Sequence, residues 1–239
     1  MSAVSWFTVP TPLPSGPVRV GVTADGVVAA DFLAAQAAPA AAQGGGPDVV
    51  RPGDEAKAAL VAERFAEYFA GRRRDLELPV DWSPTSGPQR AVLQTLHRTV
   101  GFGETVTYGE LATRSGVFED DPALRGQAAR AVGSIMGSCP VFLLVPCHRV
   151  IAKTGGGEAS REGVVVGRRV GGLGGFGGGE LGMEVKRWLL TLEGVLAPRL
   201  DWNGPGRLSR RRRRSWLRAP PPPAAASRPP LCGPRCRAG

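Results

Sequence analysis

The sequence predicts an α+β fold, with a small N-terminal domain of sheet and helix and a C-terminal domain that is mainly helical. Residues 18–23 and 27–32 alternate between apolar and other side chains around the turn Ala24-Asp25-Gly26, as in a β-hairpin. From residue 55 onward, apolar residues recur at helical spacing in several segments. The chain has 239 residues, which is enough for one or two domains with a substantial core.

The N-terminal domain is expected to span residues 1–82. Ala34 to Gly53 is rich in alanine, glycine and proline, which indicates a linker or a long loop. Residues 76–80 favour an edge strand with its proline at the margin. Glu55 to Phe69 is typical of an amphipathic helix, and its apolar residues among the charges are Leu60, Phe65 and Phe69.

The C-terminal domain, residues 83–200, is expected to contain four helices. The first begins at Pro88 and carries apolar residues at helical spacing as far as Val100. Thr107 and Glu110 form a capping-box pattern for a short second helix that ends near Gly116. A third helix is expected from about Pro122 to Ile135. The last is indicated by Trp188, Leu189, Leu190, Leu192 and Val195.

Two segments are expected to lie outside the packed core. The glycine-rich stretch 155–179 lacks the strand, the acidic residue and the Gly-Lys-Ser/Thr that would define a nucleotide loop, so we interpret it as an insertion. The arginine- and proline-rich tail, residues 201–239, is expected to be disordered. It is either low-complexity sequence without a role, a nuclear-import signal or a non-specific DNA tether.

The net charge of +9 belongs to the tail. Ten of the 30 basic residues follow Asn203, which leaves 20 bases and 21 acids before it. Any affinity of the folded body for nucleic acid must therefore come from a local patch. The four cysteines do not have the spacing of a disulfide framework or of a zinc site, so we expect a reducing compartment and no metal. No apolar run is near the roughly 20 residues of a membrane span, and the N-terminus lacks the pattern of a signal peptide.

Pro146-Cys147-His148-Arg149-Val150 carries the clearest chemical signal. It follows the apolar run 141–145, so Cys147 is expected where a buried strand ends. With its usual pKa of about 8.5, a thiol is mostly protonated at neutral pH and is then a weak nucleophile. A neighbouring histidine can act as its base, and Arg149 adds positive charge that favours the thiolate. From these residues alone, a cysteine hydrolase is an equal alternative to any other cysteine-dependent enzyme.

The helices before Cys147 point to a DNA-binding surface. The helices beginning near Thr107 and Pro122 follow one another as in a helix-turn-helix motif. The second helix contains Ala128-Ala129-Arg130-Ala131-Val132-Gly133, a small-residue face with one arginine. Small residues allow close approach to a groove, and one long cation can fill the space of a flipped base. Alternatively, this face packs against the protein and Arg130 is solvated.

Together these motifs resemble the O6-alkylguanine-DNA alkyltransferase family. The pattern comprises a tyrosine-bearing helix, an Arg-Ala-Val-Gly helix, Pro-Cys-His-Arg-Val, a glycine-rich loop with an aromatic residue, and a final Trp-Leu-Leu…Glu-Gly helix. All five elements occur in this order over about residues 85–197. The resemblance implies stoichiometric, irreversible transfer of an alkyl group from O6-alkylguanine, and from O4-alkylthymine, in double-stranded DNA to the protein's own cysteine. It implies a single-turnover enzyme without a cofactor, acting as a monomer after base flipping.

The resemblance also implies roles for individual residues. Cys147 matches the alkyl acceptor, His148 the base that acts through a water, Glu193 the carboxylate that orients it, and Tyr108 the proton donor to the departing guanine. Arg130 matches the arginine that replaces the flipped nucleotide. The remaining DNA contacts implied are Ala128, Ala129, Ala131 and Gly133 in the groove and Gln89, Gly109 and Lys153 on the backbone. The alkyl pocket would be lined by Val145, Phe176, Gly177, Gly178 and Gly179.

Three features depart from the family pattern, and three alternative interpretations stay open. Cys139-Pro140 replaces the usual Asn-Pro, the connection 117–127 is long and carries acids, and the loop 155–179 is extended. The alternatives are a non-catalytic protein that recognises alkyl damage, a cysteine hydrolase, and the inactive product of an aberrant reading frame. The resemblance implies a nuclear location in a eukaryote and a cytoplasmic one in a bacterium.

Overall fold

The computed structural model describes residues 3–32, 48–118, 122–153, 164–166, 169–177 and 179–198, together with Trp202 and Gly204. All of them belong to one compact unit, residues 1–205. The expectations for most of the loop 34–53, for much of the glycine-rich insertion and for the tail concern residues outside these ranges. No helix in the described ranges has both the length and the apolar character that a membrane span requires.

A three-stranded antiparallel sheet forms the N-terminal part. Its strands are β1 (Ser5–Val9), β2 (Val18–Val22) and β3 (Val27–Phe32), in the order β1-β2-β3. The predicted hairpin is β2–β3, while β1 was not predicted. At the turn Gly26 has φ +145°, and a Cβ there would collide with the Pro79 carbonyl, so only glycine fits. The central strand β2 is buried at every position.

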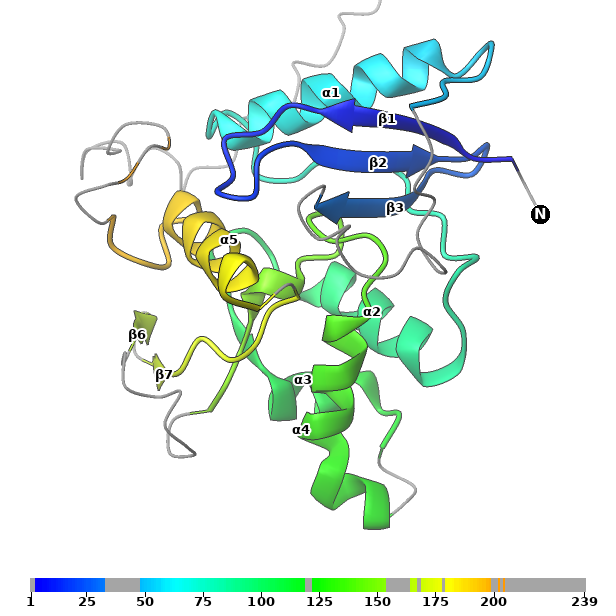
Figure 1. Ribbon diagram of the computed structural model, residues 1–239. Coiled ribbons are helices and arrows are strands. Elements are labelled where there is room, and N and C mark those ends of the chain that lie inside the picture. Colours follow the sequence, from blue (N-terminus) through cyan, green and yellow to red (C-terminus); the bar gives the residue numbers. More distant parts are fainter. Residues whose placement is uncertain are drawn as a thin grey trace, which may run out of the picture. The chain divides into compact units, whose positions relative to one another are not determined.

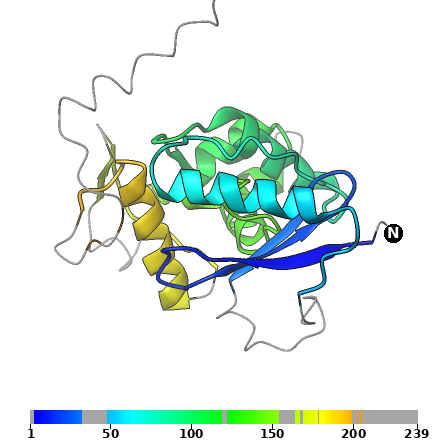
Figure 2. The same ribbon diagram turned by 90° about the horizontal axis from the view of Figure 1, so that it is seen from above.

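Helix α1 (Glu55–Phe69) has the predicted bounds and covers one side of this sheet (Figures 1 and 2). Its buried residues are Val61, Phe65, Tyr68 and Phe69, which share the hydrophobic core with the strands. Leu60, which we placed on the apolar face, is instead 40% exposed. Phe65 and Phe69 are buried as predicted, and Val61 rather than Leu60 completes the apolar face.

The edge strand predicted at residues 76–80 does not form. Only Val80 makes an isolated bridge, to Val27, while Leu76 and Leu78 are buried without strand pairing. Glu77 has φ +49°, which interrupts an extended backbone, and Pro79 has no N–H to donate.

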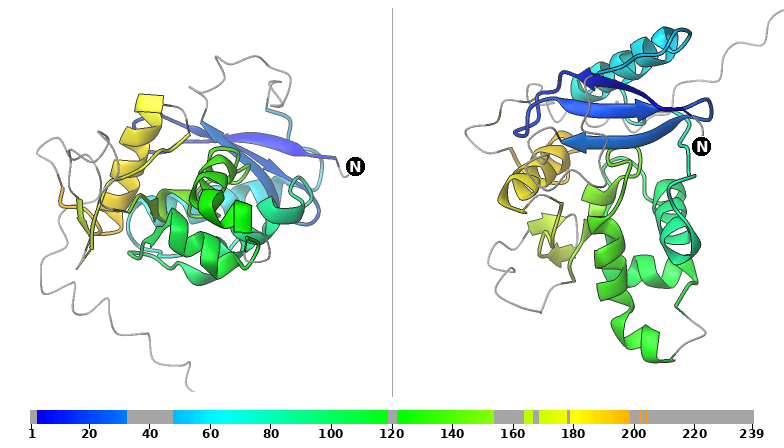
Figure 3. Two further views of the ribbon diagram at one scale, coloured as in Figure 1. Left: turned by 90° about the horizontal axis from the view of Figure 1, so that it is seen from below. Right: turned by 45° about the vertical axis from the view of Figure 1, so that its right-hand side comes forward.

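Three further helices follow, and in the right-hand view of Figure 3 they lie together below β3. They are α2 (Gly87–Thr99), α3 (Tyr108–Ser115) and α4 (Pro122–Gly137), which pack against one another. The capping box at the start of α3 is present as predicted, with the Thr107 hydroxyl accepting from the Glu110 amide and the Glu110 carboxylate accepting from Thr107. Gly116 ends α3 with φ +69°.

The strand predicted before Cys147 is wrong. Residues 141–145 close into a tight turn, in which the Val145 amide donates to the Val141 carbonyl at 3.0 Å and Leu143 has φ +74°. Every side chain of the turn is buried, which explains the error, because an apolar run does not distinguish a buried strand from a buried turn. Cys147–Arg149 then form a short 3₁₀-helix, η2.

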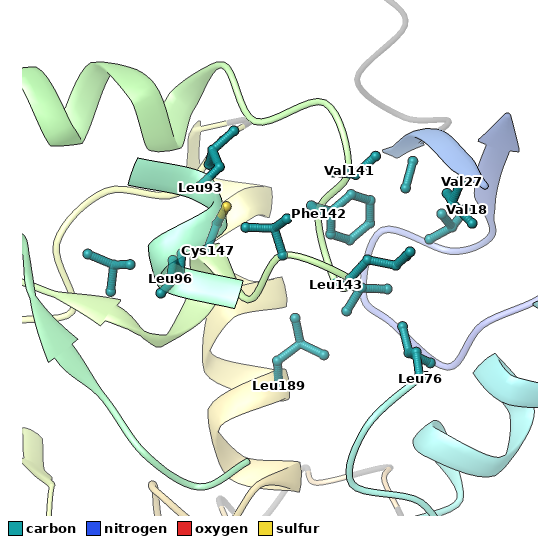
Figure 4. Close-up of a cluster of buried hydrophobic side chains, with 14 of the residues drawn as sticks. Val18, Val27, Leu76, Leu93, Leu96, Val141, Phe142, Leu143, Cys147 and Leu189 are labelled. Carbon is teal, nitrogen blue, oxygen red and sulfur yellow. The ribbon is translucent and has the colours of Figure 1, made fainter. Parts of the chain in front are cut away.

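The chain returns through short strands to a last helix. β4 (Val106–Thr107) pairs in parallel with β5 (Val150–Ile151), and β6 (Val164–Val166) pairs with β7 (Arg169–Gly171). Helix α5 (Gly179–Leu192) follows and contacts η2. One hydrophobic core joins the sheet, α1, α2 and α5 with the segment that carries Cys147 (Figure 4).

Candidate active site around Cys147

Cys147 lies at the start of η2 inside the hydrophobic core, with only 3% of its surface exposed. Figure 4 shows its sulfur among apolar side chains that include Leu93 and Leu96 of α2. The turn 141–145 positions this residue, because the Cys147 amide donates to the Val145 carbonyl at 2.8 Å. A reacting alkyl group at this thiol would be shielded from water.

His148 is paired with Glu193 in the protein interior. Its Nε2 lies 2.9 Å from Glu193 Oε1, and both side chains are fully buried. Burial lowers the pKa of His148, and the Glu193 charge only partly opposes this, so the ring is neutral at pH 7. With Nε2–H donating to the carboxylate, Nδ1 is left as the acceptor, and it has no hydrogen-bond partner among the described residues. His148 therefore has the tautomer and the free lone pair of a general base.

Glu193 follows the last turn of α5 and is the most heavily bonded group of the site. Arg149 donates to it from Nε at 3.0 Å and from Nη2 at 2.8 Å. Tyr68 Oη donates at 2.7 Å and the Gly103 amide at 3.2 Å. Burial alone would raise the pKa of Glu193, but His148 and Arg149 outweigh it and hold that pKa far below its usual range.

Two parts of this network differ from the sequence expectation. Arg149 was expected to add positive charge beside the thiol, but its guanidinium is neutralised by Glu193. Tyr68 was not predicted to belong to the site, because it comes from α1, in the other predicted domain. Its only sequence signal was its helical spacing with Val61 and Phe65. The base and its orienting carboxylate thus depend on contacts from the N-terminal half.

Lys186 is a second residue that the sequence analysis missed. It lies on the buried face of α5, and its Nζ donates to the carbonyls of Val150 at 2.6 Å and Gly175 at 3.2 Å. Burial lowers the pKa of Lys186 to about 7, and the Cys147 charge opposes that shift. The detectable signal was a lysine in register with Val185 and Leu189, on a face that is otherwise apolar.

The buried lysine gives a testable pH dependence of stability. Because the folded-state pKa of Lys186 lies near 7, below its usual value, the unfolded chain binds more protons between about pH 7.5 and 8.5. The free energy of unfolding should therefore rise with pH in this window, with this group contributing up to about 1.4 kcal/mol per pH unit. Urea denaturation of Lys186→Met should show a flatter pH slope than the wild type. Lys153→Met, at an exposed position, serves as the matched control, and a variant slope equal to the wild type would contradict the assignment.

Tyr108, the first residue of α3, is half-buried and lies close enough to Cys147 for the charge on that residue to act on it. Burial, and then the Cys147 charge, raise the pKa of Tyr108, which keeps its hydroxyl protonated. The hydroxyl donates to the Gly175 carbonyl at 3.1 Å. Gly174 packs against the ring, where a Cβ would lie 2.8 Å from Cε2, so this close approach requires glycine.

The residues expected to line an alkyl pocket do not all meet. A hollow beside α5 is lined by Leu173, Gly174, Gly175, Phe176, Gly179, Met183 and Arg187. Phe176 and Gly179 therefore lie on it, while Val145 is fully buried in the core and does not line this hollow. Gly177 is exposed, and Gly178 lies outside the described ranges.

The residues expected to contact DNA lie mainly on the surface. Arg130, Ala129, Gly109 and Lys153 are exposed, and Ala131 and Gly133 are half-buried. Arg130 makes no ion pair with any other described residue. Gln89 already donates from Nε2 to the Ser138 hydroxyl and carbonyl, at 3.1 and 3.3 Å. Ala128 is the exception: it is buried against the hydrophobic core, so it has no free surface for a groove.

Cys139 has the largest influence on the pKa of the candidate nucleophile. A side-chain hydrogen bond to Cys139, burial and the Cys139 charge together raise the pKa of the Cys147 thiol well above its usual value. The nearby Lys186 cation lowers it only in part. The free thiolate is therefore scarce at neutral pH, and reaction at Cys147 needs a base to remove the proton.

A buried cysteine, followed in the chain by a neutral histidine that is hydrogen-bonded to an ionised carboxylate, is the set of groups that a protein with a base-assisted cysteine nucleophile uses. A sequence model described as "6-O-methylguanine DNA methyltransferase, DNA binding domain" matches residues 88–195. The chain is also 39% identical over 154 residues to the DNA base-flipping protein of Thermus thermophilus, covering 63% of this chain and 84% of that protein. The chain belongs to the O6-alkylguanine-DNA alkyltransferase family.

Other relatives carry the family's enzyme name. The chain is 36% identical to the methylated-DNA–protein-cysteine methyltransferase of Shigella flexneri, over 57% of this chain and 63% of that protein. It is 41% identical to that of Mus musculus, over 44% and 38%. The match thus spans less than two thirds of these two relatives. The fold is similar to the crystal structure of Mycobacterium tuberculosis OGT in complex with DNA, with a TM-score of 0.55 and 26% identity over 79% of this chain and 91% of that one.

Proposed function

We propose that this protein repairs DNA by transferring the alkyl group of O6-alkylguanine, and of O4-alkylthymine, irreversibly to Cys147. The observation that carries the proposal is the buried array of Cys147, His148 and Glu193 in a chain of this family. The relatives named methyltransferases support it. The reaction needs no cofactor, and the protein acts once, as a monomer. Its compartment is reducing, nuclear in a eukaryote or cytoplasmic in a bacterium.

The proposed reaction is a displacement at the alkyl carbon. The Cys147 sulfur forms a bond to that carbon while the bond from carbon to guanine O6 breaks. His148 Nδ1 takes the thiol proton through a water, and Glu193 stabilises the imidazolium that results. Tyr108 gives its hydroxyl proton to the departing guanine, and must exchange its hydrogen bond to Gly175 to do so. The thioether product is not readily hydrolysed, so each protein molecule reacts only once.

DNA would be bound by a helix-turn-helix formed by α3 and α4, in a C-terminal domain of residues 83–200. Arg130 is exposed on α4 and would fill the space of the flipped nucleotide. Ala129, Ala131 and Gly133 would face the groove, and Gln89, Gly109 and Lys153 the backbone. Ala128 is left out because it is buried. The base-flipping name of the Thermus relative supports extrusion of the target.

The decisive experiment is intact-protein mass spectrometry after incubation with a duplex that contains one O6-methylguanine. We expect one added methyl group per protein, saturating with time, and peptide mapping that places it on Cys147. A hydrolase would release methanol or modified guanine repeatedly and keep no adduct. An unmodified protein that consumes no lesion would reject the proposal.

Arg130 provides a separate test of base flipping. Arg130→Ala should slow methyl transfer from duplex DNA by about tenfold or more, the equivalent of roughly 1.4 kcal/mol, and leave the reaction with free O6-benzylguanine nearly unchanged. The arginine matters only while a base is out of the stack. Single-turnover rates with both substrates measure this. The control is Arg72→Ala, an exposed arginine just beyond α1, which should affect neither rate. Equal loss on both substrates would contradict the assignment.

A second candidate function is recognition of alkyl damage without transfer. Two observations favour it: the Thermus relative is named for base flipping, and the pKa of Cys147 is raised well above its usual value. In that case the protein would bind the O6-methylguanine duplex more tightly than unmodified DNA and gain no mass. Gel-shift titration beside the mass measurement separates the two functions.

A further inference from the structure

Cys139 and Cys147 flank the turn that positions the candidate nucleophile. The neck of this turn is closed by the hydrogen bond from the Val145 amide to the Val141 carbonyl and by the bridge between Phe142 and Val145. The turn therefore brings the segments on either side of it back toward each other. Both cysteines are free thiols, and Cys139 packs against the core cluster that contains Cys147. Their side chains share a hydrogen bond.

We propose that Cys139 and Cys147 are a redox modification site: a peroxide joins them in a disulfide that blocks the alkyl acceptor until a thiol reductant releases it. The blocking effect rests on the proposed function, whereas the formation of the disulfide does not. Forming an S–S bond of about 2.05 Å requires the two sulfurs to move closer together than a hydrogen bond between thiols holds them. A nine-residue segment already folded back on itself requires little backbone movement for this.

The chemistry balances with hydrogen peroxide as the only co-reactant. One cysteine sulfur, as thiolate, attacks a peroxide oxygen; an S–O bond forms, the O–O bond breaks and water leaves after protonation. The second sulfur attacks the resulting sulfenic acid; the S–S bond forms, the S–O bond breaks and a second water leaves. The two thiols lose two electrons and two protons, which reduce one peroxide to two waters. A dithiol reductant reverses the change by thiol–disulfide exchange.

The surroundings of the pair favour this reaction. Cys139 is only half-buried, so a small oxidant reaches the pair from its side, while Cys147 is 3% exposed. The buried Lys186 offsets only part of the rise in the Cys147 pKa, so the more exposed Cys139 is the sulfur that a peroxide reaches first. With Cys139 in contact, a sulfenic acid at Cys147 is trapped as a disulfide before it reaches the irreversible sulfinic stage. The cysteine that replaces the asparagine of the family's usual Asn-Pro thus allows the single-use acceptor Cys147 to be held as a disulfide and recovered by reduction.

The test treats the reduced full-length protein with hydrogen peroxide, alkylates the remaining thiols, and analyses it by intact mass and peptide mapping. Cys232 and Cys236, which lie outside the described residues, are changed to serine in all samples so that they form no competing disulfide. We expect the loss of two hydrogens, a linked peptide joining Cys139 to Cys147, and full recovery of thiols with dithiothreitol. Methyl transfer should be lost when the disulfide forms and restored when dithiothreitol reduces it.

Two matched variants, Cys139→Ser and Cys139→Asn, are made, so that the test can still be completed if one of them does not fold. Each should form no linked peptide and should instead gain oxygen on Cys147 that dithiothreitol removes incompletely. Two outcomes overturn the proposal: oxidation of the parent protein to sulfinic acid without the linked peptide, or equal recovery of Cys147 in the parent and the variants. If the reduced protein transfers no methyl group, the proposed function fails, while the linked peptide still decides the redox site.

Discussion

Replacing Cys147 with alanine is expected to abolish methyl transfer completely while leaving affinity for the O6-methylguanine duplex nearly unchanged. In the proposed reaction Cys147 is the thiol that His148 deprotonates, while burial raises the pKa of Tyr108, so its hydroxyl stays protonated and is a poor acceptor. The proposed DNA-binding residues lie on α2, α3 and α4 and just after β5, away from the substituted residue. Intact mass after saturation with the lesion, together with a binding titration, measures both effects.

Cys147→Ser is the matched control for shape. A serine hydroxyl retains the hydrogen-bonding capacity of the site but is a far weaker nucleophile than a thiolate, so it should also accept no methyl group. Cys139 is the critical alternative acceptor, because it contacts Cys147 and is more exposed. A methyl group mapped to Cys139 in the Cys147→Ala protein would contradict the assignment of Cys147 as the only acceptor.

Local signals accounted for most of the helices. The capping box at Thr107 and Glu110, Pro88 near the start of α2 and Gly116 after α3 fixed boundaries that depend on a few neighbouring residues. The hairpin β2–β3 was predictable from its alternation and turn. By contrast, β1 required its pairing with β2, a contact that the sequence pattern does not show.

The residues around Cys147 show where sequence reasoning stops. The motif led to Cys147 and His148, and the resemblance led to Glu193, which the structure joins to His148. It did not show that Arg149 is neutralised by Glu193, that Tyr68 reaches the same carboxylate from α1, or that Lys186 lies buried near the thiol. These pairings arise from tertiary packing between segments far apart in the chain, which neither periodicity nor spacing encodes.

The misassigned strand before Cys147 has the same origin. An apolar run of five residues is compatible with a strand, and the left-handed backbone at Leu143 has no sequence signal because a leucine rarely adopts it. The structural consequence is specific: a turn brings Cys139 back to Cys147, which an extended strand would have kept apart. The proposed redox site is therefore a property of the fold that the motif alone did not reveal.

Glu193→Ala should be the most destabilising single substitution in the site, lowering the free energy of unfolding by about 3–5 kcal/mol at pH 7. It removes the common partner of Arg149, His148 and Tyr68 and leaves a buried guanidinium without a counter-ion. Because the folded-state pKa of Glu193 is depressed, its stabilising effect is fully present above the unfolded pKa of about 4.3 and is lost progressively as the pH falls from there toward the much lower folded-state pKa. Urea denaturation at pH 7 and pH 4 measures both the size and this trend.

Controls separate the buried charge from the loss of a side chain. Glu67→Ala, which removes an acid paired with Arg73 near the surface, should cost no more than about 1 kcal/mol. Glu193→Gln keeps the shape and part of the hydrogen bonding, so it should fall between the wild type and the alanine variant. The double variant Arg149→Met/Glu193→Ala should recover part of the loss, because the unpaired buried guanidinium is its main source. A double variant as unstable as the sum of the two single ones would show instead that Glu193 stabilises the fold chiefly through His148 and Tyr68.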